Sequence, residues 1–419
     1  MKWNLCNRGI KYATAELEKY EEDYMQKIIT NGIIVLEDQM LQDNDVVIEN
    51  DRITGIRRTG DTDKTGSREI YDAGGAYIMP GIIDIHSDMI ETYIQPRSTA
   101  VMDFEMALGE AERVLAVCGI TTMFHSISMF RDGSWDVKEI RQSSQVKKLA
   151  GLIGEYRHRR RLIRHRYHLR YEIDNLDCYE EVAAMLEGGL VDLLSFMDHS
   201  PGQGQYKNLD IYRKHQPDEG RGLSGKEFEE LVQREMQKKT VTFPQLRKLA
   251  EIAAKHGISV ASHDDDTIEK LDMNRELGVS ISEFPITLEV AETAVKQGLQ
   301  TVLGAPNILL GGSHSGNLSA LEAVRAGAAN ILVSDYYPQA LLQAVFCLNR
   351  EHGIPLWEAV QYVTANPAKA VGLDQELGSV EIGKRADLLI VDAEEGKPAV
   401  KQVFVNGECI MECRYRVAD

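Results

Sequence analysis

The sequence lacks any long apolar run. No stretch of about 20 consecutive apolar residues occurs in its 419 residues, and the first residues show no apolar core followed by a small-residue cleavage site. We therefore expect neither a membrane anchor nor a secretion signal, and a cytoplasmic location. The 6 cysteines include no Cys-x-x-Cys pair, so we expect free thiols in a reducing compartment and no disulfide framework.

Positive charge is also scarce. Lys and Arg number 47 against 65 Asp and Glu, which gives a formal net charge of -18. Such a surface repels nucleic acid and anionic membranes, so we expect neither as a partner. The basic residues concentrate in one run, Arg157 to Arg170, which we interpret mainly as a solvated helix end that leads into a strand. The sequence leaves a homo-oligomer open.

Proline is sparse, with 11 residues against 34 glycines, and 43% of the residues are apolar, which is typical of a soluble globular protein. The two ends of the chain, residues 26–78 and 378–419, show β-branched alternation with polar and glycine breaks. Because the termini of a compact protein tend to meet, we expect these ends to form one small β-sandwich domain. Residues 1–25 are then a polar N-terminal extension, and residues 79–377 form the main domain.

The main domain alternates strand-like apolar runs with helix-like segments. The eight strand-like runs are IIDIHSD, ITTMFHSIS, HLRYEID, VDLLSFMDHS, GISVASHDD, VSISEFPIT, TVLGAPNI and NILVSDYYP. This alternation predicts an α/β fold, a TIM-like (β/α)8 barrel, whose functional site lies at the C-terminal ends of the parallel strands. A polar insert, residues 201–240, follows the fourth run, and we interpret it as a lid or a side excursion.

Residue types that bind divalent metals recur at the ends of these runs. A single histidine at a strand end is most often a hydrogen-bonded structural residue, but a set at one barrel end would converge in space. Three carboxylates in such a cluster would repel one another unless cations neutralised them. Mixed nitrogen and oxygen ligands favour zinc, with manganese, iron and nickel also compatible, as one or two ions. The candidate metal ligands are His86, Asp88, Glu172, His199, His263 and Asp335.

At these residues the sequence resembles the amidohydrolase superfamily. In that superfamily a first-strand His-x-His motif, two later histidines and a final aspartate hold one or two metals. The resemblance departs from this pattern in two places. The first motif is His86-Ser87-Asp88, and the bridging ligand is Glu172 instead of a carbamylated lysine.

Those departures and several further motifs resemble the diphosphatases of the bacterial carbon-phosphorus lyase pathway, over residues 26–417. The motifs are LRYE, MDHSPGQ, SHDDDT, EFPIT, GAPNILLGGSHSGN and SDYYP. The resemblance implies hydrolysis of alpha-D-ribose 1-methylphosphonate 5-triphosphate between its α and β phosphorus atoms, with release of pyrophosphate. Divalent ions would lower the pKa of the attacking water and polarise a phosphoryl oxygen. Asp335 is placed to accept the proton of that water, although it could serve only as a ligand.

The partner expected here is a small-molecule phosphorylated sugar. Its triphosphate needs cationic or N–H groups in the protein to bind it. The glycine-rich loop 311–317 should lead into a helix that begins near residues 317–319, and its N–H groups could bind phosphate. An ordinary βα loop is the alternative. Arg97 and Arg170 are the cations expected near phosphate, and a pair between Arg170 and a barrel carboxylate is the alternative for the second. The loop residues assigned to the substrate are Gly312, Ser313, His314 and Asn317.

Other polar residues receive structural interpretations. We interpret four histidines, His125, His165, His168 and His256, as core or surface residues. The aspartates Asp264–Asp266 could orient His263, but we favour a cap of the next helix for at least one of them.

Two other functions stay open. The first is another amidohydrolase reaction, the opening of a cyclic amide or the deamination of a base, because one fold hosts many chemistries. Pyrophosphate release from a ribosyl triphosphate would separate these. The second is a metal-free scaffold that acts as an interaction protein, which metal analysis of the purified protein would test.

Overall fold

A computed structural model describes residues 26–61, 68–131, 138–206, 209–215, 223–313 and 317–414. The expected N-terminal extension, residues 1–25, lies outside the described residues. His314 lies outside them as well.

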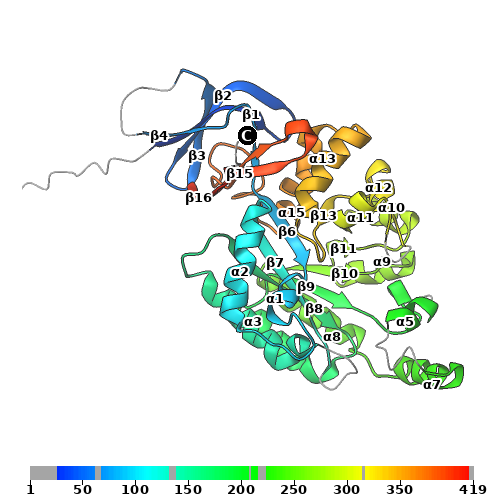
Figure 1. Cartoon of the computed structure of the whole chain (residues 1–419). Coiled ribbons are helices and arrows are strands. Elements are labelled where there is room, and N and C mark those ends of the chain that lie inside the picture. The colour runs from blue at the N-terminus through cyan, green and yellow to red at the C-terminus, as the bar shows by residue number, and fades with distance from the viewer. Residues whose placement is uncertain are drawn as a thin grey trace, which may run out of the picture.

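Both ends of the chain contribute to one mixed sheet (Figure 1). Its strand order is β16-β15-β14-β5-β1-β2-β3, with β4 paired to β1. The two ends are joined where β14 pairs with β5 in antiparallel register. The strands are β1 (Gln26–Val35), β2 (Met40–Glu49), β3 (Arg52–Arg58), β4 (Arg68–Asp72), β5 (Tyr77–Pro80), β14 (Leu388–Asp392), β15 (Ala399–Val405) and β16 (Glu408–Glu412).

This sheet folds over its own apolar face. Ile48 of β2, Ile390 of β14 and Phe404 of β15 belong to one buried cluster, although their strands are far apart in the strand order. The Tyr71 ring of β4 meets Phe404 edge-on, with ring centroids 4.8 Å apart. The expectation that the two β-rich ends pack together is therefore confirmed.

The eight sequence runs form a parallel barrel. Every neighbouring strand pair is parallel, and backbone bonds link the first and last strands at one end, from Asp88 N to Asp335 O (2.8 Å) and from Asp335 N to His86 O (3.0 Å). The (β/α)8 prediction is confirmed. The strands are β6 (Ile82–Ser87), β7 (Ile120–Met129), β8 (Arg164–Glu172), β9 (Leu193–Met197), β10 (Ser259–His263), β11 (Ile281–Glu283), β12 (Gln300–Gly304) and β13 (Ile331–Val333).

Helices cover the outside of the barrel, while Ile83, Phe124 and Val302 fill its interior. The main covering helices are α2 (Phe104–Val117), α3 (Ser143–Tyr156), α4 (Tyr179–Glu187), α8 (Phe243–Lys255), α9 (Ile268–Glu276), α10 (Leu288–Lys296) and α13 (Ala340–His352). The other helices are α1 (Ile90–Ile94), α5 (Leu209–His215), α7 (Gly225–Met236), α11 (Ala305–Leu310), α12 (Ala320–Arg325), α14 (Leu356–Gln361) and α15 (Ala365–Ala370). In the described part of the chain, no helix combines the length and apolarity needed to cross a membrane.

The basic run leads from a helix into a strand, as expected. Helix α3 ends at Tyr156 and strand β8 begins at Arg164. Arg157 pairs with Asp192, and Arg164 pairs with Asp387 of the sheet domain. These arginines bind neighbouring carboxylates at the end of the barrel opposite the strand C-termini, so they form no anion-binding patch there.

Candidate active site

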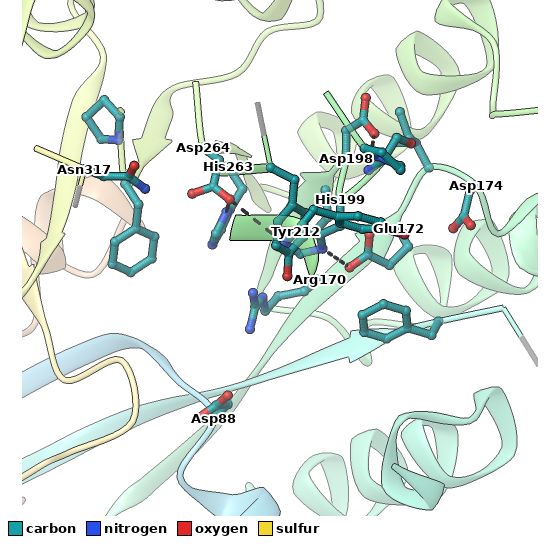
Figure 2. A pocket seen from close by; sticks show the side chains of 18 of the residues that line it. Asp88, Arg170, Glu172, Asp174, Asp198, His199, Tyr212, His263, Asp264 and Asn317 are labelled. Carbon is teal, nitrogen blue, oxygen red and sulfur yellow. Dashed lines mark hydrogen bonds and ion pairs between the residues drawn. The ribbon is translucent and has the colours of Figure 1, made fainter. Parts of the chain in front are cut away.

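A cavity of about 420 Å³ opens at the C-terminal ends of the barrel strands (Figure 2). Its size falls in the range of small-molecule sites. Most residues that the sequence assigned to the site line it, so the barrel brings them together as expected from parallel strands. These residues are Asp88, Arg170, Glu172, His199, His263, Ser313, Asn317 and Asp335.

Three of the strand ends share an unusual backbone conformation. Asp264 and Phe284 directly follow β10 and β11, and Asp335 lies two residues after the end of β13. Their φ angles are +52°, +53° and +60°. Each donates its backbone N–H to a carbonyl of the neighbouring strand: Asp264 to Glu283, Phe284 to Val302 and Asp335 to His86. A left-handed conformation is costly for residues with a side chain, and such strain concentrates at functional sites. Here it turns three cavity-lining side chains across the barrel mouth.

Three histidines converge at the mouth. The His263 ring centroid lies 5.6 Å from that of His86 and 6.0 Å from that of His199. Two sets of potential ligand atoms share His263, and within each set all atoms lie within 4.8 Å of one another. The sets are His86, His263 and Glu283, and His199, His263 and Asp264.

Two buried atoms in these sets lack a hydrogen-bond partner among the described residues. His263 Nδ1 and Asp264 Oδ2 lie 3.1 Å apart as an ion pair, and neither atom makes a hydrogen bond to a described residue. Burying such atoms unsatisfied is costly. A divalent cation accepts electron pairs from both an imidazole nitrogen and a carboxylate oxygen. The donor set therefore fits a metal ion.

Glu172 orients His199. Its Oε1 accepts a hydrogen bond from His199 Nδ1 at 2.7 Å, and its side chain is 3% exposed. Although burial disfavours the charged imidazole, the carboxylates of Glu172 and Asp264 raise the pKa of His199. The Phe130 ring stacks on His199 at 6.4 Å, so the imidazole is held at its edge and on its face.

Sequence reasoning missed Glu283, the last residue of β11. Its Oε1 lies 2.8 Å from His86 Nδ1, and its Oε2 accepts from Ser195 Oγ at 2.6 Å. Burial opposes the carboxylate charge, but His86 and His168 lower the pKa of Glu283. The available signal was its position in the sixth strand-like run, VSISEFPIT. Glu283 lies where the strand of that run ends, as the other candidates do in their runs.

Arg170 has no partner within the cavity. Among the residues that the structure describes, no acceptor makes a hydrogen bond or ion pair with its guanidinium, and its Nε is buried. Figure 2 shows the Arg170 side chain in the space between Asp88 and the imidazoles of His199 and His263. Burial and the neighbouring Glu91 raise the pKa of Asp88, whereas Arg170 lowers it. The alternative of a fixed pair between Arg170 and a barrel carboxylate is not observed.

A family model described as "Amidohydrolase family" matches residues 208–410. The alpha-D-ribose 1-methylphosphonate 5-triphosphate diphosphatase of Escherichia coli (strain K12) is 31% identical over 388 residues, which cover 91% of this chain and 99% of that protein. The chain belongs to the amidohydrolase family.

This amidohydrolase is also similar to proteins named for other reactions. An adenine deaminase of Klebsiella pneumoniae (strain 342) is 22% identical over 427 residues, 96% of this chain and 58% of that protein. The solved structure of N-acetylglucosamine-6-phosphate deacetylase from Pasteurella multocida matches with a TM-score of 0.60, 15% identity and coverage of 92% and 99%. A Xaa-Pro dipeptidase matches with a TM-score of 0.62, 16% identity and coverage of 93% and 100%. These structural matches establish the fold alone.

Not every candidate residue of the amidohydrolase lines the cavity. Arg97 is exposed in the loop after α1, outside the cavity lining. Gly312 donates its N–H to Asn307 O at 3.1 Å, at the end of α11, and is also outside the lining. The short helix α11 was not expected: it begins inside the run TVLGAPNI, which we interpreted as a strand, and ends at Leu310, directly before the glycine-rich loop 311–317. The following helix begins as predicted, with Ser319 as its N-cap.

The remaining polar residues of the amidohydrolase have structural partners. His125 Nε2 lies 2.9 Å from His165 Nδ1, and His165 Nε2 lies 3.1 Å from Glu112, all outside the barrel interior. Asp265 accepts hydrogen bonds from Ser262 and Ser282 and so ties β10 to β11. Helix α9 is capped by Thr267, beyond the three aspartates we expected to supply the cap.

His168 is buried in the barrel interior beneath the site. Its Nε2 lies 2.6 Å from Ser195 Oγ, and its Nδ1 lies 2.8 Å from Ser126 Oγ. Burial lowers the pKa of His168 to about 3, so the ring is neutral at ordinary pH. It supports the Ser195–Glu283 pair and makes no contact with the cavity.

The insert of residues 201–240 borders the cavity of the amidohydrolase. Tyr206, Leu231 and Lys238 from its described part lie in the cavity lining. The contact is close at Gly204, whose φ is +49° and where an added Cβ would lie 2.9 Å from Asp264 Cβ. The insert therefore packs directly against a candidate metal-binding carboxylate.

Proposed function

We propose that this amidohydrolase is a metal-dependent diphosphatase that converts alpha-D-ribose 1-methylphosphonate 5-triphosphate to the 5-phosphate and pyrophosphate. The 31% identity to the Escherichia coli protein, over 91% of the chain, supports this assignment. The structural observation that carries it is Arg170, whose guanidinium lines the cavity beside the buried histidines and carboxylates and has no partner among the described residues. An unpaired cation in such a position favours an anionic substrate.

The proposed metal ligands are the six residues named from the sequence, joined by Asp264 and Glu283 because these complete the two ligand sets. The mixed nitrogen and oxygen donors favour zinc. A bound divalent ion would act as a Lewis acid toward a phosphoryl oxygen and would lower the pKa of the attacking water.

The chain's own residues have separate roles. Glu172 and Glu283 hold the His199 and His86 rings through hydrogen bonds of 2.7 and 2.8 Å. Such carboxylate partners fix the imidazole orientation and raise its basicity. Asp335, held by backbone bonds on both sides, accepts the proton of the attacking water.

Arg170 binds an oxygen of the α phosphoryl group, where negative charge gathers as water attacks. Preorganised cations at that position stabilise the transition state more than the ground state. Ser313 and Asn317, which lie between β12 and β13 and line the cavity, are the proposed contacts to the rest of the substrate. Roles for Arg97, Gly312 and His314 in substrate binding stay predictions.

Deamination is the second candidate, because an adenine deaminase is similar over 96% of the chain. A neutral base, however, leaves the Arg170 guanidinium without a partner. Pyrophosphate release is therefore the reaction that the cavity favours.

The test measures pyrophosphate release from the ribosyl triphosphate by the purified protein, with and without a chelator. We expect release that the chelator abolishes and that added zinc restores. Adenine and a hydantoin serve as control substrates in the same buffer. Ammonia release from adenine without pyrophosphate formation would reject the proposal.

A further inference from the structure

A buried carboxylate near the cavity holds two cations. Glu91, in α1, has a side chain that is 1% exposed. Its Oε1 accepts from Arg141 Nε at 2.6 Å, and its Oε2 accepts from Lys138 Nζ at 2.8 Å. Burial opposes the charge, but these two cations lower the pKa of Glu91. The buried Glu91 carboxylate therefore shares its one negative charge between two cations.

Arg141 presents its positive charge to the cavity. Its side chain lines the cavity and is 23% exposed. The guanidinium carbon lies 5.5 Å above the Phe130 ring, which in turn stacks on His199. The guanidinium is therefore held next to the candidate metal ligands by Glu91 on one side and Phe130 on another.

The Nη donors of Arg141 remain available. Its one hydrogen bond to a described residue uses Nε. Nη2 lies 3.6 Å from Asp88 Oδ2, which is too far for a hydrogen bond. A guanidinium whose Nε is fixed, and whose Nη groups make an ion pair with Asp88 but no hydrogen bond to a described residue, is suited to bind two oxygens of a phosphate at once.

The other sides of the cavity offer less to an anion. Lys238 lies near two carboxylates, Asp174 at 3.8 Å and Glu235. The described lining residues between β12 and β13 are uncharged, and the N–H groups of Gly311 and Gly312 donate to carbonyls of α11. The two lining arginines, Arg170 and Arg141, thus come from β8 and from the segment that follows β7.

We propose that Arg141 binds the β and γ phosphates of the substrate, the part that leaves as pyrophosphate. This inference rests on the proposed function. Water oxygen forms a bond to the α phosphorus, and the bond from that phosphorus to the bridging oxygen breaks. The bridging oxygen keeps the electron pair and departs with pyrophosphate, while the water proton passes to Asp335. Arg141 stabilises the charge that the leaving pyrophosphate gains.

This arrangement fixes the orientation of the substrate in the cavity. Arg170 contacts the α phosphoryl group, Arg141 contacts the leaving phosphates, and the sugar points toward Ser313 and Asn317. Arg141 then determines specificity for a polyphosphate over a monophosphate.

The experiment compares Arg141→Gln, Arg141→Lys and the wild-type protein, each loaded with zinc. Arg141→Lys keeps the ion pair to Glu91, so it guards against a folding defect, yet it loses the planar fork. Arg159→Gln is the matched control, because Arg159 is an exposed arginine paired with Glu105 and Glu155, away from the cavity lining. Calorimetry measures binding of inorganic tripolyphosphate and of orthophosphate.

We expect tripolyphosphate affinity to fall at least about 10-fold in both Arg141 variants, the loss of one charge-assisted pair. Orthophosphate affinity should fall by much less, and Arg159→Gln should match the wild type. In the hydrolysis assay the Arg141 variants should raise KM for the ribosyl triphosphate by a similar factor.

The outcomes separate this inference from the proposed function. If the wild type releases pyrophosphate and the Arg141 variants keep its KM and tripolyphosphate affinity, the Arg141 inference is overturned and the proposed function stands. If the wild type releases no pyrophosphate but tripolyphosphate binding still depends on Arg141, the proposed function is rejected and Arg141 is supported as a polyphosphate-binding residue.

Discussion

His86 Nδ1 lies 2.8 Å from Glu283 Oε1, and the two side chains are 1% and 0% exposed. Ser195 Oγ donates to the other carboxylate oxygen of Glu283 at 2.6 Å, so the carboxylate cannot turn away. A fixed acceptor at Nδ1 leaves Nε2 of His86 as the nitrogen free to bind a cation. A buried carboxylate in this position raises both the basicity and the order of the ring.

Glu283→Gln should therefore weaken zinc binding by about 10- to 100-fold, because the neutral amide is a poorer acceptor for the ring N–H. Competition with a chromophoric chelator measures the zinc affinity. Glu276→Gln, at an exposed position of α9, is the control and should leave the affinity unchanged. Equal zinc affinity in the two variants would show that Glu283 neither binds nor orients anything at the metal site.

Glu172 gives a second prediction, which depends on charge. Glu172→Gln should lower kcat by about 100-fold, because both the ligand role and the bond to His199 need a negative carboxylate. Glu172→Asp keeps the charge and should lose much less. Steady-state pyrophosphate release measures both. Equal and mild losses would place Glu172 at the edge of the site.

Metal removal gives a third prediction, which concerns stability. Without a cation, the buried His263 Nδ1 and Asp264 Oδ2 make no hydrogen bond to any described residue. Zinc at about 100 times its Kd should stabilise the fold by about 2.7 kcal/mol. The thermal midpoint of chelator-treated protein should rise when zinc is added. His263→Ala should lose this response, and a full response in that variant would exclude His263 as a ligand.

The sequence predicted the barrel and most of the cavity for a simple geometric reason. Parallel strands in a barrel end at the same rim, so His199, His263 and Asp335 had to meet if their runs were strands. Periodicity and the order of the runs were enough to place them.

The local details depended on three-dimensional contacts that no run revealed. Glu283 acts through Ser195 and His86, which come from other strands. Arg141 lies in a segment without a motif, and its position depends on the burial of Glu91. The aspartates after β10 suggested a helix cap, but the left-handed turn at Asp264 carries the chain past them, and Thr267 caps the helix instead.

Asp84 is a fully buried carboxylate between the first and last barrel strands. Its Oδ1 accepts from the backbone N–H groups of His86 at 3.3 Å and Ser334 at 3.2 Å. Its Oδ2 has no hydrogen-bond partner among the described residues. Burial raises the pKa of Asp84 from 3.8 to about 6, and the bonds from Ser334 and His86 oppose only part of that rise.

The pKa of Asp84 is higher in the folded protein than in the unfolded chain, so ionisation of Asp84 destabilises the fold. The penalty is absent below about pH 4, grows as pH rises to about 6, and reaches about 3 kcal/mol above that. Asp84→Asn keeps the Oδ1 acceptor without the charge. Between pH 4 and 6.5 the free energy of unfolding of this variant should therefore fall less than that of the wild type. Denaturant titrations across pH 4 to 8 measure the difference, with exposed Asp38→Asn as the control. If the free energies of unfolding of Asp84→Asn and the wild type change with pH in the same way, ionisation of Asp84 does not destabilise the folded protein.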